Sequence, residues 1–165
     1  DGPEFVIVEA ANSGTGSDIV LTEPDIENII RAKAAMYAGV HTLLDAVNLS
    51  IKDIDRVIIA GALGNWLDLD KAIFIGIFPD LPRDKFAYLG NGSLRGARLA
   101  SLSSRMLEEA EGIARMMTNI ELSDNHRFNE NYLSAMFLPH TDLDRFPSVK
   151  ARLAGERKVA LRVVS

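Results

Sequence analysis

Residues 56–65 read Arg56-Val57-Ile58-Ile59-Ala60-Gly61-Ala62-Leu63-Gly64-Asn65, a β-branched apolar run that stops at a turn containing two glycines. The apolar run predicts a fully buried strand. Glycines at the end of such a strand allow the backbone to approach a ligand where a Cβ atom would collide. The stretch therefore indicates a ligand site, although nothing in it specifies a nucleotide.

A second turn of the same design comes after a strand predicted at residues 86–89. It reads Gly90-Asn91-Gly92-Ser93 and leads into a helical pattern. Two such turns in neighbouring parallel strands would line one crevice at the carboxyl edge of the sheet. Neither turn matches the phosphate motif G-x-x-x-x-G-K-S/T or the dinucleotide motif G-x-G-x-x-G. The alternative that both are ordinary connections between helices and strands therefore stays open.

The composition predicts one domain, spanning residues 1–165, with 47% hydrophobic residues. The net charge of -5 is spread along the chain without a basic run, so we expect no nucleic-acid partner. No apolar stretch reaches the roughly 18 residues that span a bilayer. We find no signal pattern either, so we expect no membrane association and a cytoplasmic protein.

Cysteine is absent, so this chain forms no disulfide and ligates no iron-sulfur cluster through thiolates. Its histidines, His41, His126 and His140, are too scattered to predict a metal site.

The N-terminal part predicts two strands, at residues 5–8 and 19–21, joined by a polar loop. A helix then begins after Thr22, the expected N-cap, with a proline and carboxylates in its first turn, and runs to about residue 47. Its apolar stripe consists of Ile26, Ile30, Tyr37, Val40, Leu44 and Val47.

Lys33 occupies the position where this stripe should continue. In one interpretation its stem lies over apolar surface and its amine reaches water, as is common for lysine. In the other, the stripe passes a ligand crevice at that turn, and the ammonium meets a polar group of the ligand.

Further along the chain, we expect a helix at residues 67–78 capped near Asp68, and a long helix opened by Ser93. The apolar stripe of the long helix is expected in the core and consists of Leu99, Leu102, Met106, Ala110, Ile113 and Met117. A strand at 119–122, a helix at 127–137 and a last strand at 158–164 follow. Alternating strands and helices predict an α/β fold with a largely parallel sheet.

Six segments occur in the order and spacing of one known family: Asp18-Ile19-Val20-Leu21-Thr22, Ala32-Lys33-Ala34-Ala35, Ala60-Gly61-Ala62-Leu63-Gly64-Asn65, Ile75-Gly76-Ile77-Phe78-Pro79-Asp80-Leu81-Pro82, Gly90-Asn91-Gly92-Ser93-Leu94 and Ala135-Met136-Phe137-Leu138-Pro139-His140-Thr141. Together they resemble the C-terminal region of the reductive activators of corrinoid proteins. Those activators are ATP-dependent iron-sulfur proteins that return an inactivated cobalamin methyl carrier to its Co(I) state.

The resemblance implies an α/β fold of the ribonuclease-H-like type, with a mixed sheet flanked by helices. This lobe would be the second half of an actin-like ATPase domain, as in acetate kinase, sugar kinases and heat-shock chaperones. By the same resemblance, adenosine would be bound by Lys33, Gly61, Ala62, Gly64, Asn65, Gly90 and Asn91.

One position departs from the family pattern. Members usually carry Gly-Gly-Phe-Gly-Asn where this chain has Gly61-Ala62-Leu63-Gly64-Asn65. If Ala62 required a positive φ, its methyl group would cost on the order of 1 kcal/mol.

The resemblance also implies a longer parent protein. Its first ATPase half would supply the phosphate loops and the carboxylates for magnesium, and a cysteine-rich domain would hold the iron-sulfur cluster. We therefore expect ATP as the ligand, magnesium and the cluster in the parent only, and a corrinoid protein as the partner of the parent. We expect no catalytic residue in this chain and no ATPase activity from it alone.

Two other functions remain open. The chain could be an interaction module that docks a corrinoid protein or forms a homodimer through residues 128–146, where Phe137, Leu138, Leu143 and Phe146 form an apolar group. It could also be half of a small-molecule kinase that shares the fold, because fold alone does not determine the reaction.

Overall fold

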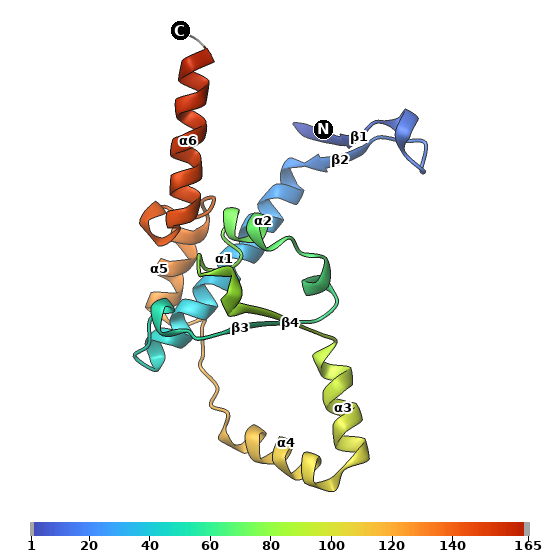
Figure 1. The fold of residues 1–165 in the computed structure, drawn as a ribbon, viewed down its shortest axis with the longest axis vertical. Coiled ribbons are helices and arrows are strands. Elements are labelled where there is room, and N and C mark those ends of the chain that lie inside the picture. The colour runs from blue at the N-terminus through green and yellow to red at the C-terminus, as the bar shows by residue number, and fades with distance from the viewer. Residues whose placement is uncertain (1, 164–165) are drawn as a thin grey trace.

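The computed structural model describes the backbone of residues 2–163, and the side chains in that range except those of Leu63, Asn65 and residues 157–163. The strands β1 (Glu4–Val8) and β2 (Ile19–Thr22) form an antiparallel hairpin that leads into the long helix α1 (Glu23–Ala46). The strands β3 (Val57–Ala60) and β4 (Phe86–Gly90) pair in parallel, and α2 (Leu69–Phe74) lies between them in sequence. The helices α3 (Gly92–Leu102), α4 (Ser104–Met116), α5 (His126–Ala135) and α6 (Pro147–Val163) follow (Figure 1).

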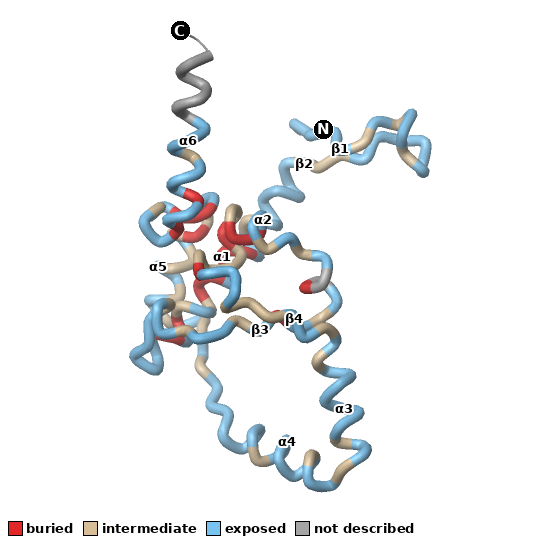
Figure 2. The backbone as a smooth tube through the Cα atoms, in the orientation of Figure 1, coloured by how far each residue is buried: buried red, intermediate tan, exposed pale blue. Residues whose placement is uncertain are grey.

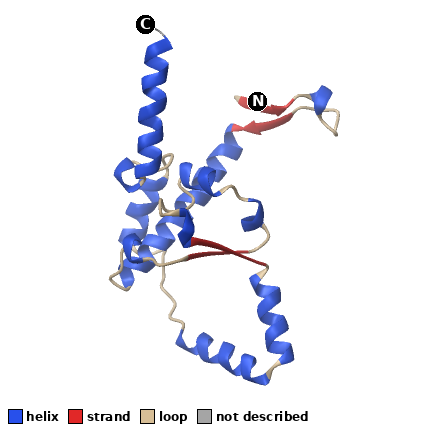
Figure 3. Ribbon diagram, viewed as in Figure 1, coloured by secondary structure: helices blue, strands red, loops and turns tan. Residues whose placement is uncertain are grey.

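These elements spread outward from a small centre, as Figure 3 shows. The β1–β2 hairpin projects from the start of α1, while α3 and α4 form an arc that returns to α5. The accessible surface is 12279 Å², whereas a compact monomer of this mass exposes roughly 8,000 Å². Large apolar side chains on the hairpin and the arc are consequently exposed, among them Phe5, Leu94, Leu102 and Met116.

The core lies where α1, α2, α5 and the start of α6 meet, and it is drawn in red in Figure 2. Its buried members are Ala34, Tyr37, Ile73, Ala135, Phe146 and Val149. The strands contribute little to it, since Ile59 of β3 is the one strand residue in the described part of the chain that is buried.

The N-terminal predictions are confirmed. Both strands form, and α1 begins with a capping box in which the Thr22 hydroxyl accepts from the Asp25 N–H while Asp25 accepts from the Thr22 N–H. The expected stripe of α1 is only partly buried, because Tyr37 and Leu44 are buried whereas Ile26, Val40 and Val47 are exposed. Lys33, Ala34, Ala38 and Thr42 complete the buried face, and α5 packs on α1.

The expected long helix after Ser93 is wrong in two respects. It is divided into α3 and α4 at Ser103, which has an extended backbone and whose hydroxyl caps α4 by accepting from the Met106 N–H. Its apolar stripe is not core, since Leu99, Leu102, Ile113 and Met117 are all exposed. The periodicity correctly indicated helix, but no other element of the described chain covers the face.

Two predicted strands are also wrong. Residues 119–122 form no regular structure, and residues 158–163 continue α6. Val164 lies outside the described residues. Alternation over so few residues is weak evidence when a helix of good formers precedes it and can propagate through it. The helix at 127–137 and the Asp68 cap of α2 are confirmed, although α2 ends at Phe74 rather than at Phe78.

The sheet differs from the expected largely parallel one. The described strands form two separate pairs, one antiparallel and one parallel. Strand β3 is not fully buried either, because alternate side chains of a strand point to opposite faces and Ile58 lies on the uncovered face.

Candidate functional site

The two glycine turns lie side by side, as their sequence positions predicted. Ala60 and Gly90 are partners in the parallel β3–β4 register, and the Gly61 N–H donates to the Gly90 carbonyl at 2.7 Å. Both turns therefore leave the same carboxyl edge, where η3 (Leu63–Trp66) and α3 begin (Figure 1).

Gly61 and Gly64 have different structural roles in this turn. Gly61 has a φ of 102°, and a Cβ atom built on it would meet no heavy atom within 4 Å. The space beside Gly61 is thus open to a ligand. Gly64 is buried, and a Cβ atom there would lie 2.5 Å from Cγ2 of Ile59. Gly64 is needed so that the turn can fold back on β3.

Ala62 has φ -64° and ψ -40°, which is the right-handed helical region. The expected cost of a methyl group at a positive φ therefore does not arise, and the departure from the family pattern is harmless to the backbone. The side chain of Asn65 lies outside the described set. Trp66 follows directly, and 89% of its surface is exposed.

Trp66 was missed by the sequence reasoning. The signal was present, because it is the one tryptophan of the chain and it immediately follows Asn65. A large aromatic side chain left in water beside a ligand turn is a natural stacking surface.

Asn91 holds the start of α3. Its side-chain oxygen accepts from the Leu94 N–H at 3.0 Å, and the Arg95 guanidinium donates to the Leu89 carbonyl at 3.3 Å. The turn at Gly90 is thereby tied to both the strand before it and the helix after it.

Lys33 is fully buried, so the interpretation in which its amine reaches water is wrong. Its ammonium donates to the carbonyl oxygens of Phe137 and, at 2.6 Å, of Pro139. These carbonyls belong to the segment between α5 and α6, and neither is part of a glycine turn. Burial lowers the pKa of Lys33 from 10.5 to about 8, since no carboxylate compensates for the lost water.

His140 lies beside this clamp. Its Nδ1 accepts from the Asp142 N–H at 2.9 Å, and its buried Nε2 has no partner among the described residues. Burial lowers the pKa of His140, and the nearby positive charges of Arg145 and Lys33 lower it further. The imidazole is therefore neutral at pH 7, which avoids a second buried positive charge next to Lys33.

Gly76 is a further position that the sequence reasoning did not single out. Its φ is 83°, and a Cβ atom there would lie 2.5 Å from the Pro139 carbonyl oxygen. Gly76 and Lys33 thus both lie against the Pro139 carbonyl. This contact packs two of the family segments, Ile75–Pro82 and Ala135–Thr141, against each other.

The apolar group proposed for docking is only partly exposed. Phe137 and Leu138 are exposed, Leu143 is half-buried and Phe146 belongs to the core. The helices within residues 2–163 include none with the length and apolar character that a membrane span requires. The same residues bring together no three His, Asp or Glu side chains able to hold a metal ion.

Known proteins match most of this chain. A family model for the C-terminal domain of RACo, the ASKHA domain, matches residues 1–150. The corrinoid activation enzyme RamQ of Eubacterium limosum is 36% identical over 129 residues, covering 78% of this chain and 22% of that protein. The Co(II) methylated amine-specific corrinoid protein reductase of Methanosarcina barkeri is 29% identical over 120 residues, covering 72% and 22%.

One solved structure, of a reductive activator for corrinoid, iron-sulfur protein, superposes with a TM-score of 0.83 at 53% identity. The match covers 88% of this chain and 23% of that chain. This chain therefore spans less than a quarter of the length of the relatives that it matches.

Proposed function

We propose that this chain, which belongs to the family of C-terminal ASKHA domains of RACo, is the adenosine-binding lobe of an ATP-dependent reductive activator of corrinoid proteins. The family and the structural likeness confirm a mixed α/β, actin-like domain. All three relatives have names that describe activation or reduction of corrinoid proteins, which supports that activity for the longer protein of which this chain would be the C-terminal domain.

The observation that carries the proposal is the open space beside Gly61 where β3 and β4 end together. Ligands of parallel α/β sheets bind outside the carboxyl ends of strands, where the turns diverge. The hydrogen bond between Gly61 and Gly90 holds both turns in one surface. In this proposal, base and ribose lie over Gly61, Ala62 and Gly90, with Trp66 as a stacking face.

The remaining site residues have supporting roles. Gly64 allows the turn to fold onto β3, and Asn91 fixes the start of α3. Asn65 is included in the proposed site because it directly follows Gly64 in the sequence. Lys33 is proposed to act from a distance, because it holds the helix α1 to the segment after α5 rather than donating to either glycine turn.

Reduction of the corrinoid cobalt would depend on a conformational change of the activator. Lowering cobalt from Co(II) to Co(I) with a cellular reductant is uphill, so the electron transfer must be coupled to a source of free energy. ATP would supply it by closing a cleft between two lobes and changing how the corrinoid protein is held. This chain would bind adenosine and transmit the motion. For a homodimer, the proposed contact is the exposed pair Phe137 and Leu138.

Phosphate and magnesium contacts would come from the other lobe, since the described residues gather no carboxylate cluster. The chain has no cysteine to ligate an iron-sulfur cluster, so that cofactor would also belong elsewhere in the parent. We expect the isolated chain to release no phosphate from ATP, because phosphoryl transfer needs positioned metal and phosphate contacts. A phosphate-release assay with added magnesium checks this, and metal-dependent turnover would contradict it.

Gly61→Val is expected to weaken ATP binding by about tenfold or more, because a branched side chain would occupy the open space beside the turn. Calorimetric titration of ATP against the full-length protein measures the effect. Gly16→Val in the loop between β1 and β2 is the matched control, since Gly16 also has a positive φ, of 73°, a Cβ atom there also meets nothing within 4 Å, and it lies far from the turn in sequence.

Circular dichroism shows whether Gly61→Val stays folded, and unchanged affinity in a folded variant would remove adenosine from this turn. A measurement without strain at Gly61 is the fluorescence of Trp66. ATP should change the emission of the full-length protein, and Trp66→Phe should reduce that change while leaving the fold intact.

A further inference from the structure

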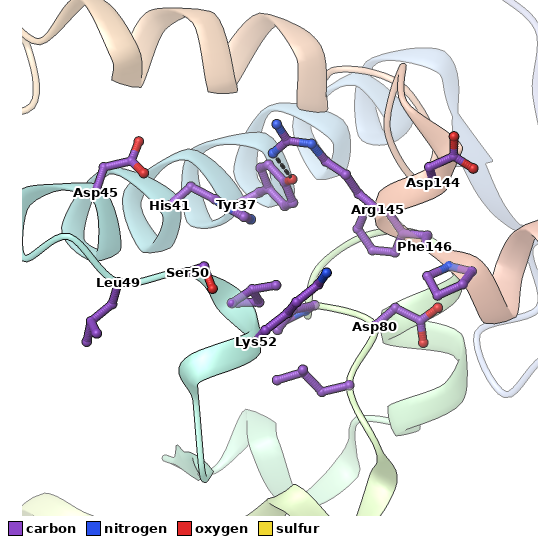
Figure 4. Close-up of a pocket in the computed structure, with 14 residues that line it drawn as sticks. Tyr37, His41, Asp45, Leu49, Ser50, Lys52, Asp80, Asp144, Arg145 and Phe146 are labelled. Carbon is purple, nitrogen blue, oxygen red and sulfur yellow. Dashed lines mark hydrogen bonds between the residues drawn. The ribbon is translucent and has the colours of Figure 1, made fainter.

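A cavity of about 420 Å³ lies at the other end of α1 from the β1–β2 hairpin (Figure 4). It is lined by the C-terminal half of α1, residues 49–52, the loop at residues 79–81 and the turn before α6, and it is open to solvent at the exposed residues Asp45, Leu49 and Lys52. No residue of the two glycine turns lines it. A volume of this size is in the range of small-molecule sites.

The floor of the cavity is apolar and firmly packed. Tyr37, Leu81 and Phe146 are buried there, and the Tyr37 ring lies 6.1 Å from the Phe146 ring. Tyr37 is also held in place, because its hydroxyl accepts from the Arg145 guanidinium at 2.9 Å. Such a floor suits a flat or aliphatic group of a ligand.

The carboxylates around the cavity all have partners. Asp80 accepts from the backbone N–H and the hydroxyl of Ser148, at 2.6 and 2.8 Å, and pairs with Arg83. Asp144 pairs with Lys150, and Asp45 lies 3.5 Å from Arg127.

Lys52 differs from these groups. Its ammonium has no hydrogen bond or ion pair to any residue that the structure describes, and it points into the cavity towards the wall formed by Arg145 and Phe146 (Figure 4). Unpartnered charge at this site is therefore positive.

His41 adds a neutral polar group to the same cavity. Its ring lies 4.2 Å from the Tyr37 ring. Burial lowers the pKa of His41 to about 4, with a smaller contribution from Arg145, so the imidazole is uncharged at pH 7. A neutral imidazole can donate one hydrogen bond without requiring a counter-ion.

We propose that this cavity binds a small organic carboxylate whose apolar body lies on Tyr37 and Phe146 and whose charge meets Lys52. A monoanion fits better than a phosphate dianion, because Asp45, Asp80 and Asp144 also stand around the cavity and would repel a second negative charge. The carboxylate could come from a free acid or from the C-terminus of a peptide, and both present the same chemistry.

The probe for the free acid is 3-phenylpropionate, titrated into the full-length protein and followed by ligand-observed NMR. The neutral 3-phenylpropanamide is the matched ligand. We expect the acid to bind about three- to fivefold more tightly than the amide, because Lys52 is exposed and an ion pair in contact with water contributes up to ~1 kcal/mol. Lys52→Gln should abolish that preference, whereas Lys71→Gln should not, since Lys71 is exposed and paired with Asp68 on α2.

A second variant keeps Lys52 in place. Leu49 lines the cavity and is partly exposed, so Leu49→Glu should weaken the acid and leave the amide unchanged. A peptide ending in a free phenylalanine carboxylate, compared with its amidated form, tests the other source; tighter binding of the free peptide than of 3-phenylpropionate assigns the site to a chain terminus.

Equal affinity for acid and amide, or an acid preference that survives Lys52→Gln, would overturn the proposal. ATP binding is measured on the same variants and should not change. The proposal of a carboxylate site and the proposal of an adenosine site are therefore tested independently of each other.

Discussion

Gly76→Ala is expected to lower the free energy of unfolding by about 3 kcal/mol or more. The residue has a φ of 83°, where a side chain is strained, and its Cβ atom would lie 2.5 Å from the oxygen and 3.1 Å from two carbons of Pro139. These are backbone atoms, and the Pro139 carbonyl also accepts a hydrogen bond from Lys33, so they cannot move aside cheaply. Urea denaturation followed by circular dichroism measures the loss.

Gly39→Ala is the matched control. Gly39 lies within α1, and a Cβ atom there meets nothing within 4 Å. Replacing a helical glycine by alanine in open space should stabilise the domain by about 0.5–1 kcal/mol. If Gly76→Ala cost no more than an ordinary surface substitution, the contact between Gly76 and Pro139 would be absent in solution.

The stability provided by Lys33 should depend on pH. The pKa of Lys33 is about 8 in the folded chain and 10.5 when the lysine is in water. Between these values the unfolded chain binds the proton and the folded chain has released it, so stability rises with pH. The free energy of unfolding of the wild type, taken relative to Lys33→Met, should grow by up to about 3 kcal/mol from pH 8 to pH 10.5.

The comparison with Lys33→Met removes the titration of all other groups from the result. The neutral amine keeps N–H donors for the carbonyls of Phe137 and Pro139, so the clamp survives deprotonation. Lys71→Met is the control for the loss of a lysine charge, because Lys71 is exposed and its replacement leaves the Lys33 contacts in place. A difference between the wild type and Lys33→Met that does not change with pH would show that the amine of Lys33 is not buried in solution.

Much of the candidate site was predictable from the sequence. The turns at Gly61 and Gly90 were found from two apolar strands that end in glycines, and parallel pairing places them together. Lys33 stands out in the sequence because it interrupts an apolar stripe. The partners of that lysine were not predictable, since they lie 104 and 106 residues away in the chain.

Short-range chemistry explains what could be derived from the chain alone. The Thr22 and Asp68 caps and the starts of their helices depend on residues within a few positions, so sequence determines them. Burial depends on whether segments distant in sequence pack against a residue. The methionine-bearing stripe of α3 and α4 has a helical period yet stays in water, because nothing in the described chain packs on it. The contacts of Gly76 and Lys33 with the Pro139 carbonyl are decided only by the tertiary structure, because these residues lie far apart in sequence. The same holds for the unpaired Lys52 beside the apolar floor of the cavity, whose residues come from distant segments.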